Sequence, residues 1–243
     1  FFISLFFLPK SVSRVLLPLL YRIDTTRKDL FQRALNVYGK IMAIGGYYIA
    51  LIFFLFGNHF VTMFFGDRYA DTVPLLRIVS FGIPFLFTVS DSVMIALEKQ
   101  RAKLRIETAA LVFMIITSAV LVPLFAAEGA VISFISTYVF LFAGYHLYLR
   151  YKLGFSLRRI FAVNRTLFVI CAAAIIIFQP LDAHMPFLVS PVVVSLFYAI
   201  MTILFVLDRG DIDTIRNILF KSRKTVVEKE LAVQAAENMM PSK

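Results

Sequence analysis

Long apolar runs separated by short polar stretches dominate the pattern of this chain. A helix needs roughly 17–25 apolar residues to cross a hydrocarbon layer about 30 Å thick. Because the runs are continuously apolar, without alternating polar residues, they predict helices and not membrane strands. We therefore expect an all-α fold, a polytopic membrane bundle of about seven transmembrane helices. The runs that approach or reach the required length are 1–20, 39–56, 72–97, 106–122, 128–149, 166–178 and 187–207.

Glycine and proline predict interruptions within this pattern. Gly82 and Pro84 fall in the middle of the third run, where proline removes a backbone hydrogen bond and kinks a helix. Pro123 ends the fourth run, and only four residues separate it from the fifth, so these two helices should be antiparallel neighbours. Residues 58–71 and 98–105 are expected to be turns, and 21–40 an interfacial helix that leads into the second run.

The chain divides by composition into two parts. Residues 1–207 form the predicted transmembrane lobe with a terminal helix pair, and its first span is expected to be truncated because the chain starts within an apolar run. Residues 208–243 are polar, with an apolar stripe followed by a basic end. That pattern predicts a cytoplasmic amphipathic, basic tail that lies at an anionic membrane surface.

Composition and charge distribution support a membrane protein and exclude a nucleic-acid partner. The chain is 60% hydrophobic and 16% charged, with a mean hydropathy of +0.84, whereas soluble domains are about 25% charged. The net charge is +10, and most of the basic residues lie in alternate connections, which carry 5, 4, 5 and 7 Lys and Arg residues, while the opposite connections carry only Arg68. This positive-inside bias places the basic connections and the C-terminus in the cytoplasm.

Two cations lie inside the first apolar run. Lys10 and Arg14 are four residues apart and share a helix face. Counted inward from Arg22 at 1.5 Å per residue, they lie about 18 Å and 12 Å deep. A cation at that depth costs at least about 2.5 kcal/mol, so the pair is expected to face a wet cavity and to suit a phosphate-bearing ligand. The alternative is that both side chains extend toward the headgroups.

The third run carries the other intramembrane charges. Arg77 lies near its outer end, either as a contact for an anionic substrate or as a cation that extends to the headgroups. Asp91 lies about 10 Å inside the cytoplasmic end. It is interpreted either as the partner of a cation such as Arg14 or as a proton-coupling carboxylate. His146, between Tyr145 and Tyr148, fits an interfacial aromatic belt.

Signatures of enzymes and metal sites are missing from the sequence. Three scattered histidines have no metal-ligand spacing, and the chain contains no glycine-rich phosphate loop. Cys171 lies in an apolar run and is expected to be a packed small hydrophobe. The acidic residues of 208–213 suit helix capping better than metal binding. We expect no catalytic activity, no metal and no cofactor.

Three motifs resemble one transporter family. They are residues 11–18 (SVSRVLLP), residues 64–69 (FFGDRY) leading to 74–78 (PLLRI), and residues 121–123 (LVP) followed by Gly129 and Ala130. Their order and spacing resemble the C-terminal half of bacterial polysaccharide flippases, the oligosaccharidyl-lipid branch of the multidrug/oligosaccharidyl-lipid/polysaccharide exporter superfamily. The likeness covers about 1–152. In two departures, a glycine usual after the proline turn is Ala126, and an asparagine common before it is replaced at Thr117 and Ser118.

The resemblance implies a function, a location and partners. It implies two pseudo-symmetric helix bundles that move an undecaprenyl-diphosphate-linked oligosaccharide from the inner to the outer leaflet by alternating access. That transport serves surface polysaccharide biosynthesis, of lipopolysaccharide O-antigen or exopolysaccharide, in the bacterial inner membrane. The partners would be the lipid-linked oligosaccharide, membrane lipids, a missing N-terminal lobe and polysaccharide polymerase machinery. Lys10, Arg14 and Arg77 would then be candidates to contact the diphosphate.

Other functions fit the sequence less well. A drug or cation antiporter of the same superfamily should place acidic residues in its cavity, whereas intramembrane cations here outnumber Asp91 three to one. A membrane glycan polymerase or ligase should have a large outer loop, and the outer connections are short. A heptahelical retinal receptor would need a lysine in the seventh run, which has none.

Overall fold

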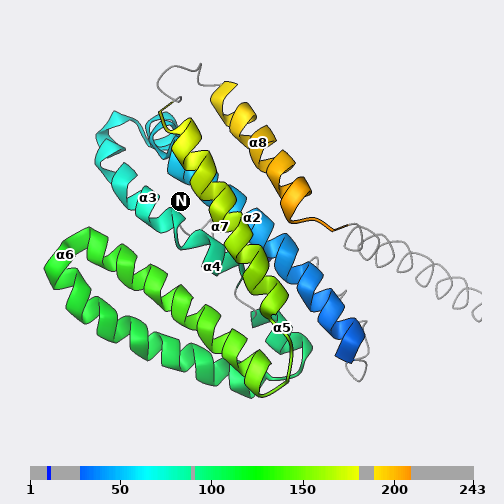
Figure 1. Cartoon of the computed structure of the whole chain (residues 1–243). Coiled ribbons are helices and arrows are strands. Elements are labelled where there is room, and N and C mark those ends of the chain that lie inside the picture. The colour runs from blue at the N-terminus through cyan, green and yellow to red at the C-terminus, as the bar shows by residue number, and fades with distance from the viewer. Residues whose placement is uncertain (1–9, 12–27, 89–90, 181–188, 209–243) are drawn as a thin grey trace, which may run out of the picture. The chain divides into compact units, whose positions relative to one another are not determined.

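The computed structural model describes residues 10–11, 28–88, 91–180 and 189–208, and these form helices without any strand. The chain divides into two compact units, Phe1–Val206 and Leu207–Lys243, and every helix named here belongs to the first. The all-α prediction is confirmed. In chain order the elements (Figure 1) are α2 (Lys28–Phe65), the 3-10 helix η1 (Asp67–Thr72), α3 (Val73–Ser80), α4 (Ile83–Thr88), α5 (Asp91–Ala96), α6 (Gln100–Tyr151), α7 (Arg158–Phe178) and α8 (Val189–Phe205).

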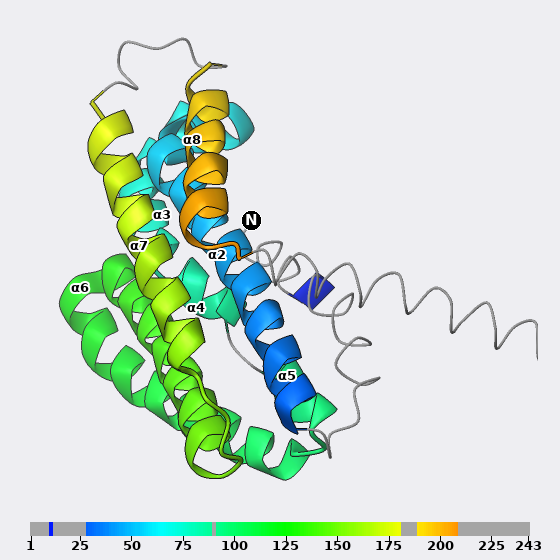
Figure 2. The same ribbon diagram turned by 45° about the vertical axis from the view of Figure 1, so that its right-hand side comes forward.

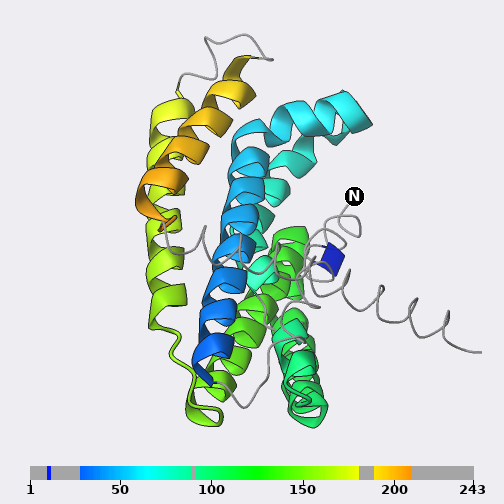
Figure 3. The same cartoon turned by 90° about the vertical axis from the view of Figure 1, so that its right-hand side faces the viewer.

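Helix α2 is the element against which most others pack, because it contacts α3, α4, α7 and α8. Residues four apart share a helix face, and Ala43, Tyr47, Leu51 and Leu55 form such a stripe within a buried cluster with α7 and α8. A second cluster joins other α2 side chains to α3, α4, α5 and the last turns of α6. Figure 3 shows α2 (blue) running beside α7 and α8 (yellow-green and orange).

Helix α6 is a hairpin of two antiparallel arms, 100–125 and 127–151 (Figure 2). The chain reverses at Ala126, which adopts φ 48° and ψ −121° just after Pro123. The rings of Phe113 and Phe140 stack across the arms with centroids 4.9 Å apart. The expected antiparallel pairing of the fourth and fifth apolar runs is therefore present.

The third apolar run is interrupted at Gly82. Helix α3 ends at Ser80 and α4 begins at Ile83, and the segments Asp67–Ser80 and Ile83–Ala96 are bent by 53° relative to each other. Pro84 lies in the first turn of α4, where its missing N–H has no helical partner to lose. A Cβ on Gly82 would lie 2.8 Å from Cγ1 of Ile135, so this break also packs closely against the second arm of α6.

Two predicted turns are shorter than expected. Residues 58–71 do not form one turn, because α2 continues to Phe65 and the chain turns at Gly66, whose φ is 81°. Val61 explains the extension, since it is buried in a cluster with residues of α3. Similarly, the turn predicted over 98–105 closes by Lys99, and α6 begins at Gln100.

Seven transmembrane helices are not confirmed. Three helices of the described part, within α2, α6 and α7, are long and apolar enough to cross a membrane, and the bent α3–α5 segment makes a fourth if it counts as one span. Three causes lower the number. Helix α8 has only 17 residues, and most of the first predicted span lies outside the described residues. The hairpin α6 also counts once, although it has two arms.

Candidate functional site

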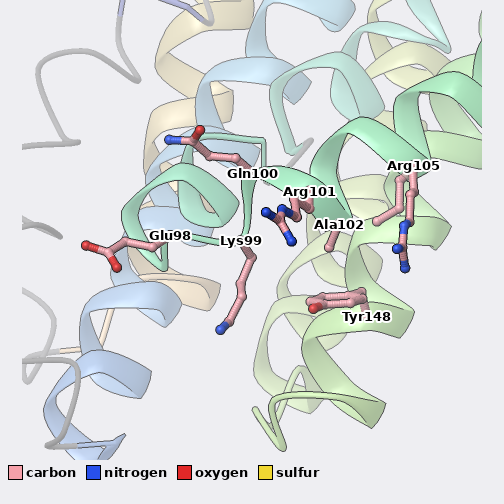
Figure 4. Close-up of a pocket in the computed structure, with 8 residues that line it drawn as sticks. Glu98, Lys99, Gln100, Arg101, Ala102, Arg105 and Tyr148 are labelled. Atoms are coloured by element: carbon pink, nitrogen blue, oxygen red, sulfur yellow. The ribbon is translucent and has the colours of Figure 1, made fainter.

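A cationic pocket lies where α5 passes into α6. It has a volume of about 680 Å³ and is lined by Glu98, Lys99, Gln100, Arg101, Ala102, Arg105, Ile106 and Tyr148. The side chains of Lys99, Arg101 and Arg105 extend on the side of the first turns of α6 that faces Tyr148, which lies near the other end of the same helix (Figure 4). The side chains of Glu98 and Gln100 extend away from Tyr148. A tight turn brings these residues together, because Glu98 has a φ of 58° and the amide of Lys99 donates to the carbonyl of Met94, 2.9 Å away. We call this set the cationic pocket.

The three cations of the pocket are not neutralised by neighbouring carboxylates in the described part of the chain. Glu107, which is near them in sequence, pairs instead with Lys103 at 3.6 Å and accepts a hydrogen bond from the hydroxyl of Tyr145 at 3.0 Å. Lys99, Arg101 and Arg105 are exposed. The lining of the cationic pocket therefore carries three cations against one carboxylate, that of Glu98, and it presents a net positive charge to an incoming ligand.

The composition of the cationic pocket suits a phosphate group. Arginine offers a planar fork of donors that binds phosphate oxygens in pairs, and lysine adds a point charge. The hydroxyl of Tyr148 can donate as well. The arrangement can bind and orient an anion, and its lining contains no nucleophile placed beside a general base.

An apolar groove lies further along the same hairpin. It has a volume of about 610 Å³ and is formed by the two arms of α6 together with α3, through Ile78, Phe81, Phe113, Ile132, Ile135, Ser136, Val139, Phe140 and Ala143. Ser136 is its only lining residue with a polar side chain, and that hydroxyl already donates to the carbonyl of Ser133, 2.9 Å away. We call this the apolar groove.

Of the sequence-predicted charges, Lys10, Arg77 and Asp91 fall within the described residues, and none of the three lines the cationic pocket or the apolar groove. Lys10 is helical and exposed, and its predicted companion Arg14 lies outside the described residues. Arg77 is exposed in the last turn of α3 and lines neither the cationic pocket nor the apolar groove. Asp91 is the first residue of α5, with α4 between it and α3. Their predicted roles remain predictions.

A buried cation that the sequence did not single out lies on α2. Lys40 is 3% exposed, and its ammonium donates to the carbonyl of Val206, 3.2 Å away, just beyond the end of α8. Cations are favourable at helix C-termini, where the last carbonyls lack helical partners. In the sequence Lys40 is one of the basic residues of a connection, and nothing local indicates that the chain returns to it 166 residues later.

Two residues without a predicted functional role are packed side chains: His146, for which the sequence predicted an interfacial aromatic belt, and Cys171, for which it predicted a packed small hydrophobe. His146 is buried; a hydrogen bond of 2.8 Å joins its Nδ1 to the carbonyl of Phe142, and its ring lies 3.9 Å from the Phe142 ring. Cys171 is buried as expected, and its thiol donates to the carbonyl of Tyr47 at 3.6 Å. No group of three or more potential metal ligands occurs among the residues that the structure describes.

The sequence contains one signal for the cationic pocket, the basic connection 98–105. Arg101 and Arg105 are four residues apart, so they share a face once 100–105 is recognised as helical. Tyr148 had no such signal, because it approaches from the far arm of the hairpin. Comparison of the chain with protein-family models, with curated proteins and with solved structures finds no match in any of the three.

Proposed function

We propose that this chain is part of a membrane transporter that moves an undecaprenyl-diphosphate-linked oligosaccharide from the inner to the outer leaflet during surface polysaccharide biosynthesis. The proposal combines the resemblance of residues 1–152 to polysaccharide flippases with the membrane-type helices of the fold. In it, the chain works by alternating access against a second helix bundle in the bacterial inner membrane. Surface polysaccharide polymerases are its proposed functional partners.

The observation that carries the proposal is the interrupted apolar helix at Gly82. Secondary transporters build substrate sites from discontinuous membrane helices, because a break provides both a hinge and free backbone groups. Here the break between α3 and α4 comes five residues after the exposed cation Arg77. A cation beside a bent membrane helix suits an anionic substrate such as a lipid diphosphate.

The proposal includes a finer topology than the helix count alone gives. The two arms of α6 each cross the membrane, α3–α5 together make one bent span, and α2, α7, α8 and the first apolar run make the remaining four. With this count, the distribution of Lys and Arg places the cationic pocket and the C-terminus in the cytoplasm. In this proposal Lys10, Arg14 and Arg77 are the candidates to contact the diphosphate of the substrate.

The test measures lipid-linked oligosaccharide on each leaflet in cells that lack the full-length gene. Reintroducing the unmodified protein should relieve accumulation on the cytoplasmic leaflet, and Arg77→Gln or the pair Lys10→Ala/Arg14→Ala should relieve it at least tenfold less efficiently. Arg33→Gln is the matched control, because Arg33 is an exposed cation of α2 away from the break.

Two results would overturn this proposal. If cells without the gene accumulate no lipid-linked oligosaccharide, the glycolipid substrate is wrong. If they instead become sensitive to cationic drugs, the antiporter alternative takes its place, with Asp91 as the first residue to replace.

A further inference from the structure

We propose that α6 carries a binding site for an anionic phospholipid, with the headgroup phosphate in the cationic pocket and one acyl chain in the apolar groove. The proposal requires only that the chain lies in a membrane, and it does not depend on the transport function proposed above. The observation that supports it is that the two cavities follow each other along one hairpin in the order in which a phospholipid arranges its own parts.

The first arm of α6 links the two cavities along a single face. Ile106 lines the cationic pocket and Phe113 lines the apolar groove. Seven residues separate them, which is close to two helical turns, so both side chains lie on the same face about 10 Å apart along the axis. Each headgroup region of a bilayer is roughly 5–8 Å thick. A ligand that spans the distance between the two cavities therefore reaches from the headgroup region into the hydrocarbon core.

The second arm repeats the same order. Tyr148 lines the cationic pocket, and Phe140, eight residues earlier, lines the apolar groove. Between these levels the arms touch, because a Cβ on Gly144 would lie 2.9 Å from Cγ2 of Ile106. This contact sets the lateral spacing of the two arms, and the helical rise sets the separation of the two cavities along the axis.

Charge and polarity select the occupant. Three exposed cations without carboxylate partners in the described part of the chain attract an anionic headgroup, and each basic residue near an anionic bilayer surface contributes favourably to lipid binding. The apolar groove offers a polar ligand no free side-chain donor, because its single hydroxyl already donates to a backbone carbonyl. A soluble anion would use only the first cavity, whereas a phospholipid uses both.

The first experiment tests the headgroup end of the site. It uses the full chain in mild detergent and measures phosphatidylglycerol binding by native mass spectrometry. The pair Arg101→Gln/Arg105→Gln should weaken binding about tenfold. Arg158→Gln/Arg159→Gln is the matched control, because it removes two exposed arginines from the start of α7, outside both cavities. Equal losses in the two pairs would mean that only overall charge matters, and would overturn the proposal.

The second experiment tests the acyl-chain end of the site by placing a bulky side chain in the apolar groove. Val139→Trp, at a lining residue that is 39% exposed, should weaken phosphatidylglycerol binding several-fold, whereas Val112→Trp, at a 52% exposed residue of the first arm outside the groove, should not. Unchanged binding in Val139→Trp would overturn the two-part site.

Competitors distinguish the source of the phosphate. Phosphatidylcholine and inorganic pyrophosphate should compete at least tenfold less well than phosphatidylglycerol. Efficient displacement by pyrophosphate would reduce the site to an anion pocket. Tighter binding of a polyprenyl phosphate than of phosphatidylglycerol would assign the site to a carrier lipid, and either result would contradict a phospholipid site.

Discussion

The hydroxyl oxygens of Thr117 and Ser133 lie 2.7 Å apart and join the two arms of α6 near the middle of the hairpin. Ser118 contacts the same Ser133 hydroxyl at 2.8 Å, and Ser133 is fully buried. The departure from the flippase pattern at Thr117 and Ser118 thus coincides with a polar contact inside the hairpin. These hydroxyls hold the two arms in register and are partly committed to each other.

Replacing Ser133 by alanine should loosen the hairpin. The substitution removes the partner of two hydroxyls, and interhelical hydrogen bonds in membrane proteins contribute about 0.6 kcal/mol each on average. We expect a loss of roughly 1 kcal/mol, measured as a lower midpoint of thermal unfolding in detergent. Thr166→Ala is the control, because that hydroxyl bonds only within α7, to the carbonyl of Ala162 at 3.1 Å. Equal shifts would show that the contact between the arms contributes nothing.

Ala126→Gly should stabilise the protein. Ala126 has φ 48° and ψ −121°, a conformation that costs a residue with a Cβ roughly 1–3 kcal/mol and costs glycine little. Ala130→Gly, one turn into the second arm, should do the opposite by up to about 1 kcal/mol, because Ala130 is helical and exposed. Chemical unfolding of both variants measures whether each substitution raises or lowers the free energy of unfolding. A lower free energy of unfolding in Ala126→Gly would show that the backbone at Ala126 is not strained.

Adjacent glycines of α2 should respond differently to alanine. A Cβ on Gly46 would lie 2.8 Å from Cβ of Phe87 and 3.2 Å from Cα of Pro84, so Gly46→Ala must push α2 and α4 apart. A Cβ on Gly45 would meet only ordinary contacts at 3.8 Å, so Gly45→Ala should be neutral or stabilise the helix by up to about 1 kcal/mol. Overpacking costs typically 1–3 kcal/mol. The unfolding midpoints of the two variants should therefore shift in opposite directions or differ clearly, and equal midpoints would argue against the α2–α4 contact.

Lys40→Met should destabilise the contact between α2 and the end of α8. Methionine keeps much of the apolar stem but cannot donate to the carbonyl of Val206, and a buried group left unsatisfied costs about 1–3 kcal/mol. Arg33→Met, at an exposed cation of the same helix, is the control for lost charge. Hydrogen exchange at the last turns of α8 should rise in Lys40→Met alone. Unchanged exchange there would show that Lys40 does not anchor α8.

The tip of the α6 hairpin, near Glu128, and its open end, near Gln100, should be accessible to a labelling reagent from opposite sides of the membrane. In a Cys171→Ala background, Glu128→Cys should react with an impermeant maleimide in intact cells, and Gln100→Cys only after permeabilisation. Both positions are exposed, so access to solvent is not limited by the fold itself. Labelling of both from one side would show that α6 does not cross the membrane as two spans.

Much of the fold could be predicted from local pattern. Continuous apolar runs predicted helices, Pro123 with its short connection predicted an antiparallel pair, and Gly82 marked the place where an apolar run is interrupted. The errors came from tertiary packing. The polar residues Asn58 and His59 suggested a turn, but α2 continues past them because Val61 is buried against α3.

The candidate site was less predictable, because it depends on residues that are distant in the chain. Arg101 and Arg105 were visible as a basic connection, yet only the reversal at Ala126 brings Tyr148 to them. The buried position of Lys40 likewise requires the return of α8 to α2. Charges inside apolar runs, such as Arg77, are easy to find in a sequence, but whether they face a cavity depends on the surrounding helices.

The exposed apolar surface of α6 bears on how the chain is made. Leu111, Ile115 and Ile116 of the first arm are 57–60% exposed, so this arm gains little from contact with the other helices. Its partition into lipid therefore depends mainly on its own side chains and little on its packing against the other helices. The hairpin can thus insert into the bilayer as an independent unit. In variants with damaged packing around α2, the hairpin should still insert.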